Sequence, residues 1–248
     1  MLEAGNLPCG EKVGKGKTMM FGNQGLSQWM IIAALLTGCA STKSPSAQTK
    51  AASPLLAKAD EFGLVDIRTV IPDIAIDLRY ATADNITGRV LYPADMPCLV
   101  WRSTAHKLRR VQDRLRAEGC RLCIWDAWRP PEVQTELMRK GGHTGMFLDP
   151  QERWSRHCSG VAVDVTLVDL EGRPMKLPTA HDEHSDAAYY QYSGTDPEVK
   201  RNVTLLQKAM EAEGFSMIPM EWWHFDDFEH FYNPPPTVFA SQLELSLP

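Results

Sequence analysis

Two short segments of the sequence carry side chains that can bind a metal ion and activate a water molecule. The segment Ser-Arg-His-Cys-Ser-Gly-Val-Ala-Val-Asp offers His157 and Asp164, and the segment Glu-Trp-Trp-His offers Glu221 and His224. A catalytic zinc ion takes three protein ligands of this nitrogen and oxygen type and leaves one position for water. A hydrolase also needs a base beside that water. The segments predict a hydrolytic zinc site with His157, Asp164 and His224 as ligands and Glu221 as base.

The spacing within the first segment restricts how the chain can run. His157 and Asp164 are seven positions apart, and a fully extended chain would separate them by roughly 23 Å. Two ligands of one ion cannot lie that far apart, so the chain must bend between them. Gly160 is the natural place for the bend, because glycine adopts turn conformations at low cost. Asp164 is then expected on a strand.

Each of these residues also has an ordinary interpretation. A histidine in a turn is usually solvated, and Asp164 in an apolar strand could belong to a salt bridge, since a buried unpaired carboxylate is costly. Glu221 and His224 could be a surface pair. The joint occurrence of both segments favours the metal site. His181 and His184 lie in an acidic stretch that we expect to be mobile, and we predict that neither is a ligand.

The remaining pattern predicts the elements that must position these residues. Extended structure is expected over residues 65–79. The predicted helices cover residues 103–118, 130–140 and 196–213, and the predicted strands cover 121–126, 160–167, 215–218 and 222–225. Helices and strands do not alternate regularly, and the late strands form hairpin-like pairs. This order favours an α+β fold, a single domain with a central antiparallel sheet flanked by helices.

Composition is that of a globular protein. Of the 248 residues, 44% are hydrophobic and 23% are charged, which is typical of a soluble folded domain. The formal net charge of −5 and the lack of a basic run argue against nucleic acid as a partner.

The N-terminal region predicts an export signal. The apolar run Trp29–Leu36 is shorter than the roughly 20 residues of a spanning helix and fits the apolar core of a signal peptide. The following Leu-Thr-Gly-Cys resembles a bacterial lipoprotein signal, with cleavage before a lipidated Cys39. We therefore expect an export signal at 1–38, lipidated Cys39 with a flexible linker over 39–60, and one catalytic domain at 61–248. An apolar helix followed by an incidental cysteine is the alternative.

The resemblance to a lipoprotein signal also carries an expectation about location. Ala40 follows the lipidated cysteine, and a residue other than Asp there is typical of outer-membrane lipoproteins. The protein is thus expected in the periplasm, anchored to the outer membrane. In that oxidising compartment a disulfide is plausible, and we predict that Cys98 pairs with Cys120 or Cys123. Buried free thiols, including Cys158, are the alternative.

Four motifs together resemble a known family. The segments SRHCSGVAVDVTLVD and EWWHF, with DLRYATADNITG and WDAWRP upstream, look like those of the zinc D-alanyl-D-alanine dipeptidases, the VanX-type enzymes. These enzymes are related more distantly to zinc D-Ala-D-Ala carboxypeptidases and to the Hedgehog signalling domain. The resemblance covers residues 65–232 and implies a Hedgehog/DD-peptidase-like fold with the zinc ion in a cleft on the sheet.

The resemblance implies a role for individual residues. His157, Asp164 and His224 match the ligands of one zinc ion per chain, and Glu221 matches the catalytic base. Arg129 matches the arginine that stabilises the oxyanion, a role that suits a permanently charged guanidinium. The positions that bind the amino end of the substrate or line its pocket are Tyr80, Ser155 and Asp182. Two departures are Cys158, where the family commonly has Ser, and Trp128, where it commonly has Tyr.

The expected activity is hydrolysis of D-Ala-D-Ala or similar D,D-dipeptides, in cell-wall dipeptide turnover or scavenging. One alternative is a zinc D,D-carboxypeptidase that acts on peptidoglycan stem peptides, and another is a non-catalytic zinc-containing binding lipoprotein. Asp182 discriminates between the two enzymes, because a carboxylate that binds the free ammonium group excludes longer peptides. The sequence leaves substrate stereochemistry and oligomeric state open.

Overall fold

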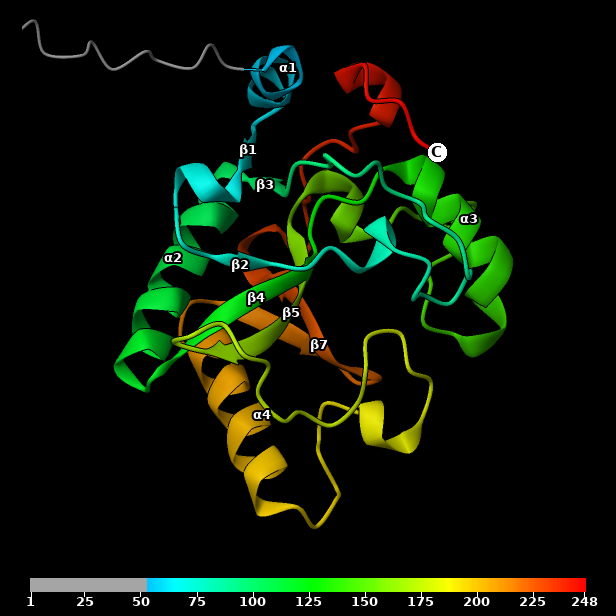
Figure 1. The fold of residues 1–248 in the computed structure, drawn as a ribbon. Coiled ribbons are helices and arrows are strands. Elements are labelled where there is room, and N and C mark those ends of the chain that lie inside the picture. The colour runs from blue at the N-terminus through cyan, green and yellow to red at the C-terminus, as the bar shows by residue number, and fades with distance from the viewer. Residues whose placement is uncertain (1–52) are drawn as a thin grey trace, which may run out of the picture. The chain divides into compact units, whose positions relative to one another are not determined.

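The computed structural model describes residues 53–248 (Figure 1). The predicted signal at 1–38, Cys39 and most of the predicted linker lie outside the described residues. The prediction of a flexible linker up to residue 60 is wrong at its end, because α1 (Pro54–Glu61) is helical. Proline at its first position suits a helix start, and Ala59 is buried.

A five-stranded sheet forms the centre of the fold, with strand order β2-β4-β5-β7-β6. Its strands are β2 (Ala75–Ile76), β4 (Cys120–Asp126), β5 (Ala162–Asp169), β6 (Phe215–Ile218) and β7 (Glu221–Asp227). The four strands from β4 to β6 pair antiparallel, as predicted, whereas β2 pairs parallel to β4. The α+β prediction is confirmed, with a mixed sheet in place of a wholly antiparallel one. A small second sheet pairs β1 (Leu64–Asp66) with β3 (Leu99–Trp101).

Two amphipathic helices pack against the five-stranded sheet. α2 (Arg102–Ala117) buries Leu108, Val111 and Leu115, and α4 (Pro197–Glu211) starts at Asp196, whose carboxylate accepts two backbone N–H groups. α3 (Pro131–Gly141) follows β4. Short 3₁₀ turns complete the secondary structure: η1 (Ile67–Thr69), η2 (Arg79–Ala81), η3 (Gly142–Thr144), η4 (Arg156–Ser159), η5 (Asp186–Ala188), η6 (Phe228–His230) and η7 (Ala240–Leu243).

The predicted elements are found within a few residues of their expected ends, except over 65–79. There the chain breaks into two short strands and two 3₁₀ turns. Within the described residues, no helix combines the length and the apolar character that a bilayer span requires.

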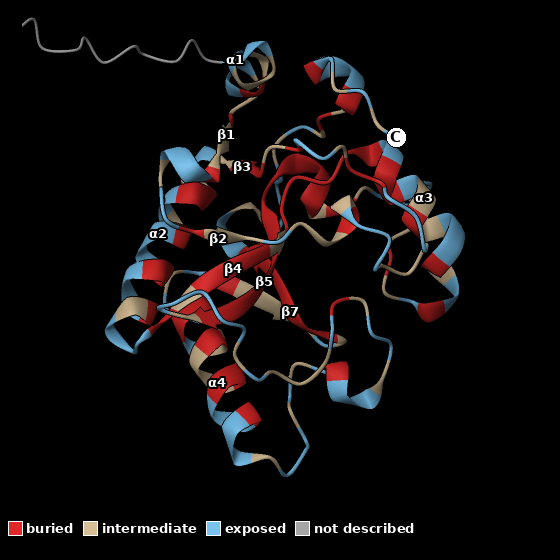
Figure 2. Cartoon of the chain, in the orientation of Figure 1, coloured by how far each residue is buried: buried red, intermediate tan, exposed pale blue. Residues whose placement is uncertain are grey.

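The centre of the sheet is buried on both faces. Figure 2 shows β4, β5 and β7 mostly in the colour of buried residues, whereas exposed residues lie on the outer faces of the helices and in the loops. Every residue of β7 is buried. Polar side chains on these strands are therefore placed in a dry environment and need partners there.

The four cysteines of the described chain are free thiols, and each is buried. The predicted bridge from Cys98 to Cys120 or Cys123 is wrong, and the alternative of buried free thiols is confirmed. Burial raises the pKa of the Cys158 thiol to about 12, so this thiol beside His157 stays protonated and unreactive.

Candidate metal centre and active site

Strand register brings three polar residues into one row across the sheet. Asp126 on β4 is the cross-strand partner of Asp164 on β5, and Asp164 is in turn the partner of His224 on β7. A bulge at Trp125 shifts the register just before Asp126, and bulges of this kind re-aim side chains next to active sites. The row therefore crosses the three inner strands of the sheet and starts at the end of β4.

The bend predicted between His157 and Asp164 is present at Gly160. This residue closes η4 in the left-handed conformation, with φ +71°. A Cβ atom there would lie 2.5 Å from the Leu64 side chain and 3.0 Å from the Trp101 backbone nitrogen, so both backbone and space require glycine. The bend folds η4 back over the start of β5 and places His157 beside Asp164.

The three predicted ligands converge on one point. His157 Nε2 lies 3.1 Å from His224 Nδ1, which lies 3.1 Å from Asp164 Oδ1, and Asp164 Oδ1 lies 3.4 Å from His157 Nε2. Tetrahedral zinc bound about 2.0–2.1 Å from each ligand separates the ligand atoms by about 3.3 Å. The triangle therefore has the size of one face of such a site, and within the described residues these three form a group that could hold a metal ion.

Outer partners fix which ring nitrogens face this point. His157 Nδ1 lies 2.8 Å from the Ala127 carbonyl oxygen, and His224 Nε2 lies 3.1 Å from Asp226 Oδ1. Both partners only accept hydrogen bonds, so these nitrogens carry the protons. The opposite nitrogens then present lone pairs toward the Asp164 carboxylate, which is the arrangement of ligands around a cation.

The electrostatics of the group favour positive charge beside Asp164. Burial disfavours the charged forms, but neighbouring His157, His181 and His224 outweigh it and hold the pKa of Asp164 well below its usual range. Burial is likewise outweighed at His224, whose pKa is held well above its usual range by Asp226 and Asp164. Without a metal this favours a proton on Nδ1, and a bound cation would displace that proton and take its place. Asp164 is therefore an anion, and the site attracts positive charge.

Arg129 is fixed by three acceptors. Its Nε donates to Asp126 Oδ2 at 2.7 Å, its Nη1 to Gln134 Oε1 at 2.9 Å and its Nη2 to Asp164 Oδ2 at 3.3 Å. The guanidinium also lies over the Tyr80 ring, 5.1 Å from its centroid. A guanidinium has five N–H donors, so part of its donor set remains for a ligand in the cavity that it lines.

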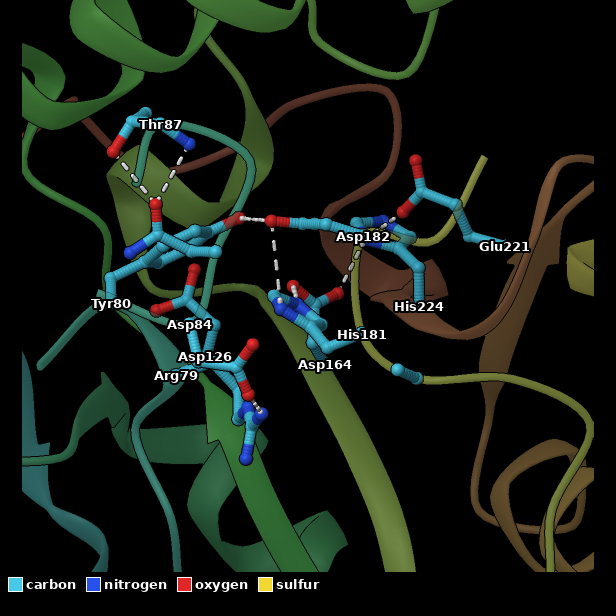
Figure 3. A network of polar contacts seen from close by, with 12 residues as sticks. Arg79, Tyr80, Asp84, Thr87, Asp126, Asp164, His181, Asp182, Glu221 and His224 are labelled. Carbon is cyan, nitrogen blue, oxygen red and sulfur yellow. Dashed lines mark hydrogen bonds and ion pairs between the residues drawn. The ribbon is translucent and has the colours of Figure 1, made fainter. Parts of the chain in front are cut away.

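A cavity of about 220 Å³ brings the site residues to one surface. It is lined by His157, Asp164, His224, Glu221, Arg129, Ser155 and Asp182, among others. Tyr80 does not line it. It lies behind Asp182 and donates to that carboxylate, with its hydroxyl oxygen 2.9 Å from Oδ2 and 3.2 Å from Oδ1 (Figure 3). Ser155 has a second role, because its hydroxyl caps η4 by accepting the His157 N–H.

Glu221 stands beside the ligand group with its carboxylate toward the cavity. Its Oε2 is 3.8 Å from His224 Nδ1. Burial raises the pKa of Glu221 to about 7, which is the range expected of a general base working near neutral pH. Trp222 and Trp223 follow Glu221 and are fully buried. Their packing fixes the strand between Glu221 and His224.

Five residues that line or support the site did not follow from the sequence: Asp126, Gln134, Arg153, His181 and Asp226. Asp126 carried the same signal as Asp164, a carboxylate in an apolar strand. His181 is not among the three residues that could hold a metal ion, and the expectation that it lies in a mobile stretch is wrong. Its side chain is 2% exposed, and its Nε2 lies 3.1 Å from Asp164 Oδ2.

A family model and two related proteins point to the same enzyme family. A family model described as D-Ala-D-Ala dipeptidase, peptidase M15, matches residues 60–242. The D-alanyl-D-alanine dipeptidase of Escherichia coli (strain K12) is 33% identical over 167 residues, which cover 67% of this chain and 86% of that protein. The enzyme of the same name from Enterococcus faecalis (strain ATCC 700802 / V583) is 24% identical over 198 residues, 72% of this chain and 97% of that protein. A solved structure of VanYB in complex with D-alanine-D-alanine is 18% identical, with a TM-score of 0.33 over 56% of this chain and 78% of that chain.

Proposed function

The chain belongs to the M15 peptidase family of D-Ala-D-Ala dipeptidases, and we propose that it hydrolyses D-Ala-D-Ala with one zinc ion per chain. The chain is thus a peptidase. The observation that carries the metal assignment is the triangle of His157, Asp164 and His224, whose lone pairs and carboxylate oxygen face one point. Two nitrogen ligands and one oxygen ligand suit zinc in catalytic sites.

The chemistry follows from where each side chain lies. Bound zinc polarises a carbonyl group and lowers the pKa of a water molecule. Glu221 takes the proton from the attacking water and returns it to the leaving nitrogen. Arg129, held in a fixed orientation, donates to the oxygen of the scissile carbonyl as negative charge develops on it. Both residues line the same cavity as His157, Asp164 and His224, so a substrate bound there can contact all of them.

The amino end of the substrate is assigned to Asp182. Its side chain is 7% exposed and faces the cavity, with the Tyr80 hydroxyl behind it. Burial raises the pKa of this carboxyl above its usual range, and an arriving ammonium group would favour the charged form again. The backbone of Asp182 is left-handed, with φ +58°, a strained state that occurs where a side chain must be aimed.

The carboxyl end of the substrate is assigned to Arg153. Two other arginines line the cavity, but Arg129 pairs with Asp126 and Asp164, and Arg156 pairs with Asp226. Arg153 has no ion-pair partner within residues 53–248. A dipeptide that carries one charge at each end would therefore be held by Asp182 and Arg153, with the scissile bond between them.

A hydrolysis panel tests this function. D-Ala-D-Ala should be cleaved, and a chelator should abolish cleavage. N-acetyl-D-Ala-D-Ala and D-Ala-D-alaninamide should be cleaved far more slowly, because each lacks one of the terminal charges, and Asp182→Ala should narrow the gap between the free and the acetylated dipeptide. L-Ala-L-Ala reports stereochemistry. Equal cleavage of the acetylated and free dipeptides would contradict the dipeptidase function and favour the carboxypeptidase.

We also propose that the enzyme faces the periplasm as an outer-membrane lipoprotein and acts in turnover or scavenging of cell-wall dipeptides. The support is the Leu-Thr-Gly-Cys sequence after a short apolar run. One lipidated cysteine anchors a soluble domain to a membrane surface. The wild-type protein should therefore fractionate with membranes, and Cys39→Ser should not. Identical partitioning of both into the soluble fraction would show that Cys39 carries no anchor.

A further inference from the structure

His181 is a buried imidazole in a mostly exposed loop between β5 and α4. Its side chain is 2% exposed, whereas Glu183 and His184, two and three positions later, are exposed. Three aromatic rings surround it, with centroids 5.4 Å (Tyr80), 5.5 Å (Trp125) and 5.7 Å (Trp223) from its own. Packing on this scale holds the ring in one place.

The ring lies between two carboxylates that serve different purposes. Its Nε2 is 3.1 Å from Asp164 Oδ2, the oxygen that points away from the ligand triangle. Because a carboxylate only accepts, Nε2 is the donor. The other nitrogen, Nδ1, has no hydrogen-bond partner and lies 3.6 Å from Asp182 Oδ2. Figure 3 shows His181 between Asp164 and Asp182.

We propose that His181 is a positioning residue that holds Asp164 in one-oxygen contact with the metal. The proposal rests on the proposed zinc site, and it is argued from the contacts of Asp164 alone.

The physical reason lies in the two oxygens of Asp164. Oδ1 belongs to the ligand triangle, and Oδ2 accepts from His181 at 3.1 Å and from Arg129 at 3.3 Å. A carboxylate can bind a metal through one oxygen or through both. Two donors on Oδ2 keep it away from the metal, and loss of His181 leaves only the longer bond from Arg129. Outer partners of this kind are worth about 10–100-fold in metal affinity or activity.

Two substitutions separate hydrogen bonding from packing. His181→Phe keeps a ring among the three aromatic side chains but removes the donor. His181→Gln loses the ring but keeps an N–H at about the position of Nε2. His184→Phe, the same change at an exposed position of the same loop, is the control. Thermal unfolding of each variant establishes that it is folded.

The readouts are zinc affinity by competition with a chelator, the absorption spectrum of the Co²⁺-substituted protein, which reports coordination, and kcat and KM for D-Ala-D-Ala. We expect His181→Phe to change the Co²⁺ spectrum and to lower zinc affinity or kcat about 10–100-fold, and His181→Gln to retain most of both. His184→Phe should match the wild type.

A His181→Phe protein equal to the His184→Phe protein would overturn the inference. A His181→Gln protein no better than His181→Phe would overturn it too, because packing alone would then explain the site. The proposed function fails separately: a wild-type protein that binds zinc but does not cleave D-Ala-D-Ala would contradict that function, while zinc affinity and the Co²⁺ spectrum would still decide the role of His181.

Discussion

Replacing Glu221 by Gln is expected to lower kcat by about 10²–10⁴-fold while the protein keeps its metal. The amide has nearly the same shape as the carboxylate but cannot take a proton from water. Glu221 is not one of the three residues of the ligand triangle, since its Oε2 lies 3.8 Å from His224 Nδ1. Metal analysis and steady-state kinetics on the same preparation measure the two properties together.

The matched control is Glu211→Gln, at the exposed end of α4, which should leave kcat unchanged. The pH profile adds an independent check. Burial raises the pKa of Glu221 to about 7, and the positive charge of a bound metal lowers it from there. The base works when deprotonated, so wild-type kcat/KM should rise with pH on a limb below about 7 that Glu221→Gln lacks. A zinc-loaded Glu221→Gln protein of full activity would mean that another group is the base.

Replacing Arg129 by Lys is expected to lower kcat by about 10²–10³-fold, the usual effect of removing one preorganised oxyanion donor. Asp126, Gln134 and Asp164 hold the guanidinium in one plane. A lysine ammonium group on a flexible chain cannot satisfy these acceptors and also reach the scissile carbonyl. The loss should fall on kcat more than on KM, because the charge develops only in the transition state.

Stability must be measured beside activity for this variant, because Asp126 is fully buried and Arg129 is its ion-pair partner. Breaking a buried pair costs about 3–5 kcal/mol. The kcat of Arg129→Lys is therefore interpreted only after thermal unfolding has established that the variant is folded at the assay temperature. Arg139→Lys, in an exposed pair with Glu136 on α3, is the control for the same chemical change. A folded Arg129→Lys protein with wild-type kcat would remove Arg129 from the mechanism.

Much of the site could be predicted because local spacing restricts the chain. Seven positions between two ligands require a bend, and Gly160 provides it. The alternating pattern around Asp164 predicts a strand, and β5 is that strand. These inferences use only neighbours in the sequence.

The rest depends on contacts between distant parts of the chain. Asp164 and His224 are 60 residues apart, and Tyr80 and Asp182 are 102 residues apart, so no local pattern shows that they meet. His181 was misjudged for a related reason. The stretch around it is acidic and mostly exposed. Composition describes such a segment as a whole, whereas the burial of one side chain depends on the residues from distant parts of the chain that surround it.

The row of Asp126, Asp164 and His224 across β4, β5 and β7 has a consequence for how the protein matures. β7 is made last, and its pairing with β5 is non-local, a kind of contact that forms slowly. The proposed metal site is therefore incomplete until β7 has paired with β5. A ligand that binds only the native state stabilises it, by about 4 kcal/mol at 1,000 times its dissociation constant. Zinc should thus stabilise the full chain against unfolding, and a chain truncated before β7 should gain no such protection.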